Sequence, residues 1–469
     1  MRHNTLRLFD PSAGLGRETP RNNSKTKTLH TMRKLAYSLL LTIAGTTAFG
    51  QSRTLEDCVG TALASNLQVR NSSLDITAAD HKIREVKAAL LPTVELNGQY
   101  LYYPNLPSQY AQASAFGGPE GQYTKMTLSM PQTTSATIQV KQNLFNKAVL
   151  TGLQAAEAYK ETARFQSALT RENLVYSVTA TYLTIQVLND NLQRLKENIQ
   201  NLEKVVKIQS SLKQNDLVTE NTYNRLLINL ENLKNQYEAT RMSQSRNITM
   251  LQYLMNVKDT VIVESLRYND PLVRPDLGDI AFRSDIQLQQ SQVELAQLEK
   301  KSITAKYFPV LTASQNYTST SYYKEFAPTK QINNDWINSN SFSLNLKIPL
   351  FDGFEKKYQV KQKDAAIQKN LNTLSLMKSD ARRQLQDASI NYDVYQAQFI
   401  SNRESLELAT RLFETSQGEY GNGLTSTTEF LNAQNDLSNA RNNYTNALLN
   451  LKLAELDLRK ANGTLLSNN

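Results

Sequence analysis

Residues 419–437 read EYGNGLTSTTEFLNAQNDL, and they set the interpretation of the whole chain. Gly421 and Gly423 can adopt a positive φ, which ends a helix. The Thr and Ser residues that follow are good N-caps, and Glu429 stands where the carboxylate of a capping box is found. The stretch therefore predicts a tight turn between two helices.

A weaker copy of this turn lies in the first half of the chain, where residues 213–223 read KQNDLVTENTY. Three pairs of residues match at one offset of 207 positions: Leu217 with Leu424, Tyr223 with Phe430, and Tyr237 with Tyr444. Two such turns in 469 residues predict an internal duplication. We therefore interpret the chain as two repeats.

The composition predicts long helices rather than a large globular core. Hydrophobic residues make up 40% of the chain, the mean hydropathy is −0.49, and there are only 16 Gly and 12 Pro. Narrow apolar seams on long helices give such values. The net charge of +9 comes mostly from residues 1–50, which hold eight basic and two acidic residues. The remaining +3 forms no basic patch with interleaved aromatics, so nucleic acid is not expected as a partner.

Residues 32–50 have the pattern of a signal peptide, with a basic start, an apolar run of about 15 residues and small residues before Gln51. This run is shorter than the ~20 residues of a membrane-spanning helix. We expect cleavage between Gly50 and Gln51. Residues 1–31 are interpreted as an upstream extension from a misassigned start, or alternatively as part of a long basic leader. The single Cys58 has no lipobox around it and is interpreted as a small residue on a helix face.

The hydrophobic period changes from helical to alternating near the start of the first repeat. A helix is predicted over residues 54–90, and Pro92 ends it. Residues 93–145 then predict a β-hairpin with a long loop at 103–124, and the second strand is expected to place Met126 to Leu144 on one apolar face. About ten residues that alternate between apolar and polar suit a tilted strand that crosses a bilayer. The same alternation is found in a sheet of a soluble protein that packs one face on a hydrophobic core.

A long helix is predicted from Lys147 to Gln214, since the segment lacks proline and has one early glycine. Its apolar residues step by four and three as in a coiled coil: Leu188, Leu192, Leu195, Ile199, Leu202 and Val206. After a turn at 213–222, a returning helix continues this spacing. These elements complete a first repeat over residues 51–255.

A linker at 256–280, with one short strand at 261–263, precedes a second repeat over 281–469. This repeat has a helix, a β-hairpin at 310–350, a long helix to about 417, a turn at 418–428 and a last helix to about 462. One chain thus offers four strands, whereas a closed barrel needs about eight or more. If the strands cross a membrane, the chain must oligomerise, and three copies would supply twelve strands above a ring of helical hairpins.

Four segments resemble the TolC family of outer-membrane efflux proteins, over essentially the whole mature chain: Leu55–Val59 with Ala62–Asn66, Leu350–Gly353, Tyr420–Ala433, and Gly463–Leu465. The resemblance implies a homotrimer with a twelve-stranded barrel in the outer membrane and a long α-helical tunnel in the periplasm. It also implies docking onto an inner-membrane transporter and a periplasmic adaptor protein. The exported cargo in this family is drugs, metals or proteins.

The resemblance also implies that the turn at Tyr420–Ala433 forms the periplasmic tip, where the tunnel is constricted. The two constricting aspartates of the family prototype align with Glu429 and Asn432, and an arginine of its gating network aligns with Thr425. Three copies of Glu429 would form an acidic ring that attracts cations, although the same carboxylate also suits a helix start. The predicted gate has nine residues: Leu217, Val218, Thr219, Thr222, Gly423, Leu424, Thr425, Glu429 and Asn432.

Four aromatic residues at strand ends suit a girdle at the membrane interface, or alternatively ordinary strand packing: Tyr100, Tyr102, Tyr322 and Trp336. Enzyme activity is not expected, because His81 is the only histidine after the leader and no catalytic set, metal cluster or phosphate loop is found. We therefore predict no cofactor and no metal.

Two other functions remain open from the sequence. A periplasmic coiled-coil scaffold without a pore would explain the heptads, the polarity and the leader. It would not explain two β-hairpins with apolar faces at matching places in both repeats. Within the channel class, drug efflux and type I protein secretion are not separated, because the transporter selects the cargo.

Overall fold

The computed structural model describes residues 52–127, 129–266, 274–275, 279–324 and 336–466. The chain divides into two compact units, Met1–Ser52 and Arg53–Asn469, and the fold described below is that of the second unit. The predicted upstream extension at 1–31 and the signal peptide at 32–50 lie outside the described residues.

The second unit repeats one order of elements. The first half holds α2 (Leu55–Ser65), α3 (Leu67–Ala88), β1 (Thr93–Tyr102), β4 (Gln132–Asn146), α4 (Lys147–Gln214) and α5 (Glu220–Met255). The second half holds α6 (Ser284–Ala305), β5 (Val310–Tyr323), β6 (Ile337–Lys347), α7 (Glu355–Gly421) and α8 (Thr427–Ala461). Matching helices have nearly equal lengths, with 22 residues in both α3 and α6, 68 and 67 in α4 and α7, and 36 and 35 in α5 and α8.

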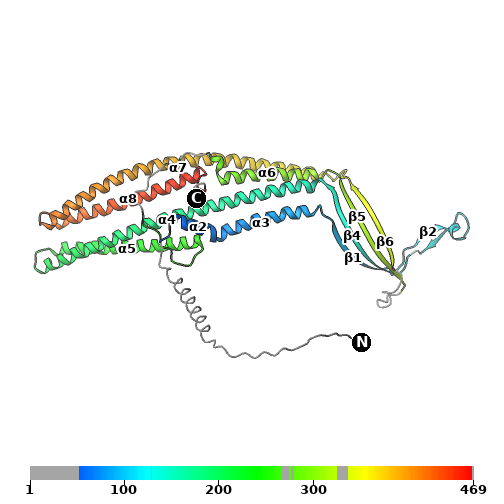
Figure 1. Cartoon of the computed structure of the whole chain (residues 1–469), viewed down its shortest axis with the longest axis horizontal. Coiled ribbons are helices and arrows are strands. Elements are labelled where there is room, and N and C mark those ends of the chain that lie inside the picture. Colours follow the sequence, from blue (N-terminus) through cyan, green and yellow to red (C-terminus); the bar gives the residue numbers. More distant parts are fainter. Residues whose placement is uncertain (1–51, 128, 267–273, 276–278, 325–335, 467–469) are drawn as a thin grey trace, which may run out of the picture. The chain divides into compact units, whose positions relative to one another are not determined.

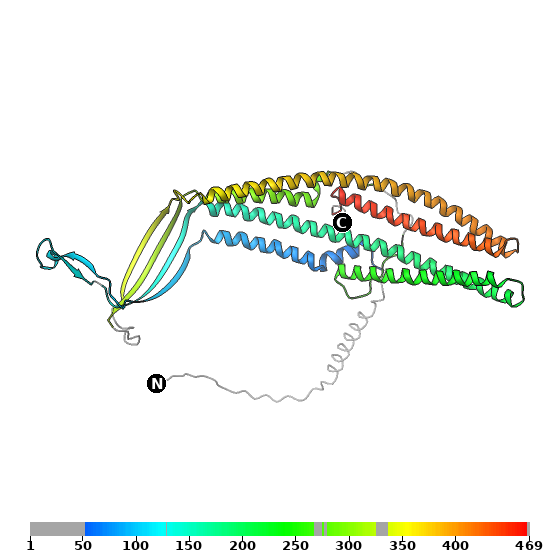
Figure 2. The same cartoon turned by 180° about the vertical axis from the view of Figure 1, so that it is seen from behind.

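The helices α3, α4, α6 and α7 lie side by side in that order, and each contacts the next (Figures 1 and 2). The strands continue from one end of this layer. The α4–α5 and α7–α8 turns lie at the other end. Among the described residues, no helix combines the length and the apolar character that a membrane span requires.

The helix predicted over 54–90 is two helices, because Asn66 interrupts it. The backbone of Asn66 is extended, and its side-chain oxygen accepts hydrogen bonds from the amides of Gln68 and Val69 at 2.8 and 3.3 Å. Its side-chain nitrogen donates to the carbonyl oxygen of Leu254 at 2.9 Å. The N-cap of α3 is thus tied to the end of α5, a tertiary contact that helical periodicity does not show.

The four long strands form one antiparallel sheet in the order β1-β4-β5-β6. Directly paired residues share a face of a sheet. Val94 pairs with Val140 and Leu96 with Ile138, so these apolar residues lie on one face, while pairs such as Thr137 with Thr318 lie on the other. The sheet therefore has an apolar face and a polar face, and the apolar side chains of β1 and β6 are exposed in the single chain.

A bulge and an extra hairpin correct two details of the predicted strands. The β4–β5 register shifts between Asn143 and Phe145, so Leu144 is the additional residue and Phe145 takes the apolar face. The region predicted as a loop at 103–124 contains β2 (Gln109–Gln112) and the 3₁₀-helix η1 (Ala113–Phe116), and β3 (Tyr123–Met126) follows it and pairs with β2. Met126 therefore does not belong to the same strand as Ala136, and Leu128 lies outside the described residues.

The predicted heptad seam packs α4 against α5 close to the turn that joins them. Leu202 of α4 and Leu226 and Leu230 of α5 form a buried cluster. Leu431 of α8 packs against this cluster. The seam therefore joins the first helical hairpin and also contacts the second.

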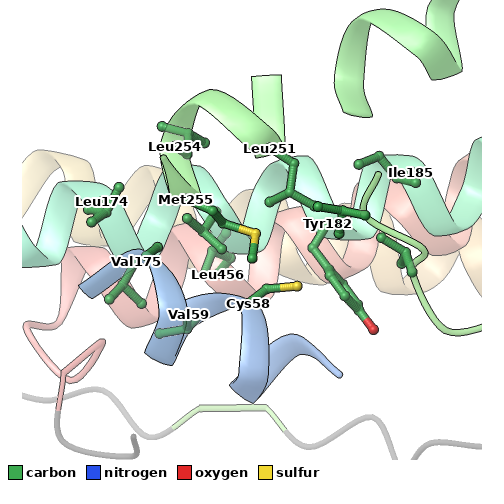
Figure 3. Close-up of a cluster of buried hydrophobic side chains, with 14 of the residues drawn as sticks. Cys58, Val59, Leu174, Val175, Tyr182, Ile185, Leu251, Leu254, Met255 and Leu456 are labelled. Atoms are coloured by element: carbon green, nitrogen blue, oxygen red, sulfur yellow. The ribbon is translucent and has the colours of Figure 1, made fainter. Parts of the chain in front are cut away.

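The main core lies where α2, α4, α5 and α8 meet, and Figure 3 shows its side chains. Cys58 and Met255 are fully buried there beside Tyr182, whose hydroxyl donates to the carbonyl oxygen of Arg53 at 3.0 Å. Arg53 forms an isolated parallel bridge with Val263, at the place where a short strand is predicted. The start of the described chain and the linker are thus fastened to the same core.

Candidate functional site

The α7–α8 turn is closed by its own backbone. Gly423 has φ of 75°, and the amide of Leu424 donates to the carbonyl oxygen of Glu419 at 2.8 Å. Ser426 is the N-cap of α8 and accepts from the amide of Glu429 at 3.2 Å. Among the described residues, this is the half of the predicted capping box that forms, so the Glu429 carboxylate stays exposed to solvent.

The α4–α5 turn has an equivalent geometry with different residues. Asp216 takes the left-handed conformation, with φ of 56°, where the second turn has Gly423. Thr219 is the N-cap of α5 and accepts from the amide of Thr222 at 3.3 Å. The equivalent leucines of the two turns, Leu217 and Leu424, are 71% and 78% exposed.

The structure places the nine predicted gate residues in these two turns and in the helix starts that follow. Leu217, Val218 and Thr219 lie in the first turn, and Thr222 lies on the first turn of α5. Gly423, Leu424 and Thr425 lie in the second turn, and Glu429 and Asn432 are exposed on the first turns of α8. Both groups lie at the end of the helices that is far from the strands (Figure 2).

Gln209 of α4 connects the two helical hairpins near these turns. Its side-chain nitrogen donates to the Tyr420 hydroxyl at 2.8 Å and to the Thr427 hydroxyl at 3.1 Å. The Gln209 side chain is only 2% exposed, so these bonds are shielded from water. The Tyr420 ring stacks on Phe430, with 4.8 Å between ring centroids, and this stack fixes the hydroxyl that Gln209 reaches.

The sequence alone did not predict that Gln209, Tyr420 and Thr427 form a group. Tyr420 and Thr427 belong to the quoted turn, whereas Gln209 lies 211 positions away from Tyr420. Gln209 follows Val206, the last residue of the predicted seam, by three positions, and a polar residue at this next seam position is the one signal that could have indicated it. Its partners follow only from the packing of one hairpin on the other.

The interface behind the turns is unusually rich in carboxamides. A cavity of about 300 Å³ between α4, α5 and α8 is lined mainly by amide side chains: Asn198, Asn229, Asn232, Gln236, Gln434, Asn435, Asn439 and Asn442. The side-chain oxygens of Gln209 and Gln434 are buried without a hydrogen-bond partner among the described residues. Unpaired buried acceptors weaken an interface, so Gln209 and Gln434 stabilise the contact between the two hairpins less than fully hydrogen-bonded side chains would.

The four predicted girdle residues lie at the end of the sheet that is far from the helices. Tyr100 and Tyr102 share the apolar face of β1 with Val94 and Leu96. Tyr322 pairs with Thr133, which is on the polar face, whereas the neighbouring Tyr323 is on the apolar face. Trp336 directly precedes β6.

The described residues contain no group of three His, Cys, Asp or Glu side chains that could hold a metal ion. The two turns carry hydroxyls, carboxamides and the exposed carboxylates of Asp216, Glu419 and Glu429. Such groups can select and retain solutes by charge and hydrogen bonding.

Duplicated α-helical hairpins that carry a four-stranded sheet define the class of outer membrane efflux proteins. The family model for "Outer membrane efflux protein" matches residues 58–248 and 280–464, which is more than half of the chain. The chain belongs to this family, whose members are channel proteins rather than enzymes.

Individual relatives agree with this assignment. The chain is 25% identical to outer membrane protein TolC of Salmonella enteritidis over 71% of this chain and 66% of that protein. It is also 25% identical to outer membrane protein TolC of Escherichia coli K12, over 87% and 83% of the two chains. The fold is similar to that of CusC, whose crystal structures have been related to folding and transmembrane channel formation. The two chains superpose with a TM-score of 0.72 and 15% identity, over 88% of this chain and 93% of CusC.

Proposed function

We propose that this protein is the outer-membrane channel of a tripartite export system. Three copies close their sheets into a twelve-stranded β-barrel in the outer membrane, and their helices form a tunnel in the periplasm. The observation that carries the proposal is the four-stranded sheet with two open edges and one exposed apolar face. In hydrocarbon, open edges must pair, and a second and third copy provide the partners.

The two faces of the sheet support this arrangement. Val94, Leu96 and Phe342 lie on the face with apolar character and are exposed, as lipid-facing residues of a barrel are. The opposite face carries pairs such as Gln139 with Asn316 and Ser314 with Ser343, which are joined by hydrogen bonds of 2.8 and 2.9 Å. A water-filled lumen suits these side chains.

The turns suit the contact with a periplasmic adaptor protein and, through it, an inner-membrane transporter. Leu217 and Leu424 are exposed apolar side chains at equivalent tips of the two repeats, where a partner could bury them. The same end holds Glu429, so cargo that enters the tunnel passes an acidic ring. Drugs or other solutes supplied by the transporter are the proposed cargo, and a protein substrate is the alternative.

Membrane fractionation tests the proposal against a scaffold without a pore. We expect the mature chain in the outer-membrane fraction, and a detergent-solubilised trimer by size-exclusion chromatography with light scattering. A mature chain recovered as a soluble periplasmic protein would support the scaffold and contradict the channel.

A further inference from the structure

An aromatic and basic stripe lies on the first two turns of α7. Four residues with the spacing i, i+3, i+4 and i+7 share one side of the start of α7: Phe354, which is the N-cap, Lys357, Tyr358 and Lys361. All four side chains are exposed, Phe354 by 52% and Tyr358 by 58%. The Lys357 ammonium lies 5.3 Å from the Phe354 ring centroid, and that of Lys361 lies 5.9 Å from the Tyr358 centroid. We name these four residues the α7 stripe.

The α7 stripe lies where the chain changes from strand to helix. Leu350 and Phe351, between β6 and α7, are 92% and 75% exposed. The Phe351 ring meets the Phe354 ring edge-on, with 5.3 Å between centroids. Phe308 lies on the turn between α6 and β5, and the ammonium of Lys147, the first residue of α4, lies 3.6 Å from its ring centroid. This end of the sheet is therefore rich in exposed rings and lysines, as the far end is in tyrosines.

The two lysines of the α7 stripe have no acidic partner in the part of the chain that the structure describes. Lys356, next to the stripe, pairs with Asp352 at 3.0 Å. Among the described residues, Lys357 and Lys361 form no ion pair, and their ammonium groups lie near the rings of Phe354 and Tyr358. Rings with lysines beside them are typical of a protein surface at a bilayer interface, where the rings enter the headgroup layer and the amines reach phosphates.

We propose that the α7 stripe binds the headgroups of anionic phospholipids in the leaflet of the outer membrane that faces the helices. This inference rests on the proposed function, because it needs the sheet to lie in a bilayer. The rings of Phe354 and Tyr358 lie among the headgroups, and Lys357 and Lys361 bind the phosphates. The stripe thereby fixes the height of the barrel in the membrane.

A second copy of this chain is a less suitable partner for the stripe. The helices α3 and α7 are the outer members of the helical layer, so α7 of one copy would adjoin α3 of the next. The last turns of α3 carry Lys82, Arg84 and Lys87, and the nearby Glu85 is already paired with Lys82 at 2.8 Å. Two basic surfaces repel each other, whereas an anionic lipid is complementary to the stripe.

Native mass spectrometry of the purified mature protein in detergent tests the proposal. The probes are phosphatidylglycerol and phosphatidylcholine with the same acyl chains. We expect the wild type to retain phosphatidylglycerol in preference to phosphatidylcholine. The double variant K357Q/K361Q should bind phosphatidylglycerol about 30-fold more weakly per site, because each lysine near an anionic surface contributes about 1 kcal/mol and about 1.4 kcal/mol is a tenfold change.

Two matched variants make the result specific. K357R/K361R keeps both charges and should keep the preference. K204Q/K207Q removes two exposed lysines three residues apart on α4, far from the strands, and should also keep it. An equal loss in K204Q/K207Q, or equal binding of both lipids by the wild type, would overturn the proposal.

The same preparation separates this inference from the proposed function. A trimer that conducts ions in a planar bilayer but shows no lipid preference overturns the lipid site alone. A chain that forms no conducting trimer overturns both. If K357Q/K361Q weakens the trimer and leaves the lipid preference unchanged, the stripe belongs to the contact between copies, and the proposal fails.

Discussion

Glu429 is an exposed carboxylate on the first turn of α8, and among the described residues it forms no ion pair. Its amide is used by the Ser426 cap, and its carboxylate is exposed. Asn432, one turn further along α8, is exposed and carries no charge. Of the two positions that align with the constricting aspartates, only Glu429 can therefore attract cations at the proposed entrance.

Replacing Glu429 tests this dependence. We expect Glu429→Gln to reduce the preference of the channel for cations severalfold, and Glu429→Lys to reverse it, because three carboxylates attract cations at the entrance. Reversal potentials in a salt gradient measure the change. Glu231→Gln, an exposed carboxylate on α5, is the control. A selectivity that stays the same in all three variants would rule out Glu429 as part of the constriction.

The ionisation of the Cys58 thiol depends on its burial in the main core. Burial raises its pKa from 9.0 to about 11, with a smaller increase from Asp57 and an opposing effect of Arg53. The unfolded thiol ionises near pH 9, whereas the folded thiol stays protonated to about pH 11. The protonated Cys58 thiol therefore makes its full contribution to the free energy of unfolding below pH 9, and this contribution is lost as the pH rises towards 11.

Two measurements follow from the raised pKa of Cys58. Maleimide should modify the native thiol at pH 8 at least a hundredfold more slowly than the thiol of the urea-unfolded chain, since roughly a hundredfold less thiolate is present. The thermal midpoint should fall more between pH 8 and pH 10 in the wild type than in Cys58→Ala. Rapid labelling of the folded protein would show that this core is open.

At the level of elements, the break between α2 and α3 depends on Asn66. Asn66→Ala removes the N-cap and the hydrogen bond to Leu254, so we expect a loss of about 1–2 kcal/mol of unfolding free energy. The thermal midpoint of the solubilised protein measures the change. Asn71→Ala, exposed on the same helix, should have little effect. Equal midpoints for both variants would mean that the break does not need this cap.

The link between the two hairpins depends on few polar contacts near the turns. Gln209→Ala removes both hydrogen bonds of the Gln209 side chain, worth about 1 kcal/mol each. We expect the second hairpin to separate more readily, with a larger single-channel conductance or a longer open time. Gln214→Ala, exposed at the end of α4, is the matched control. If Gln209→Ala leaves conductance and open time as in the wild type, this contact does not hold the entrance.

The elements with a strong local signal could be predicted from the sequence. The helix Lys147–Gln214 has the predicted bounds, because no proline interrupts it and Asn146 caps its start. The extra hairpin β2–β3 was not predicted, since its four-residue strands lie among Gly, Ser and Gln residues that favour loops. The hydrophobic periodicity of residues 54–90 likewise could not show that the helix breaks at Asn66, because the Asn66 side chain is held by a hydrogen bond to the distant carbonyl of Leu254.

The candidate site was predictable only in part for the same reason. The turn residues follow from Gly and Ser/Thr chemistry, whereas Gln209 reaches Tyr420 across two helical hairpins. The face on which Tyr322 lies follows from its pairing with Thr133, and alternation along β5 alone was too irregular to indicate it. Contacts between segments far apart in the chain decided each of these points.

At the scale of the whole molecule, one chain is incomplete as a channel. Its sheet ends in two open edges at β1 and β6, and its apolar face is exposed to solvent. The proposed trimer would pair these edges and place the apolar faces against lipid. In that trimer the polar faces would line one pore, and the three pairs of turns would surround one entrance.

Planar-bilayer recording of the purified trimer shows directly whether the protein forms a pore. We expect discrete single-channel steps for the wild type, with larger or longer steps for Gln209→Ala. A trimer that inserts into the bilayer and stays silent in both the wild type and Gln209→Ala would contradict the proposed channel.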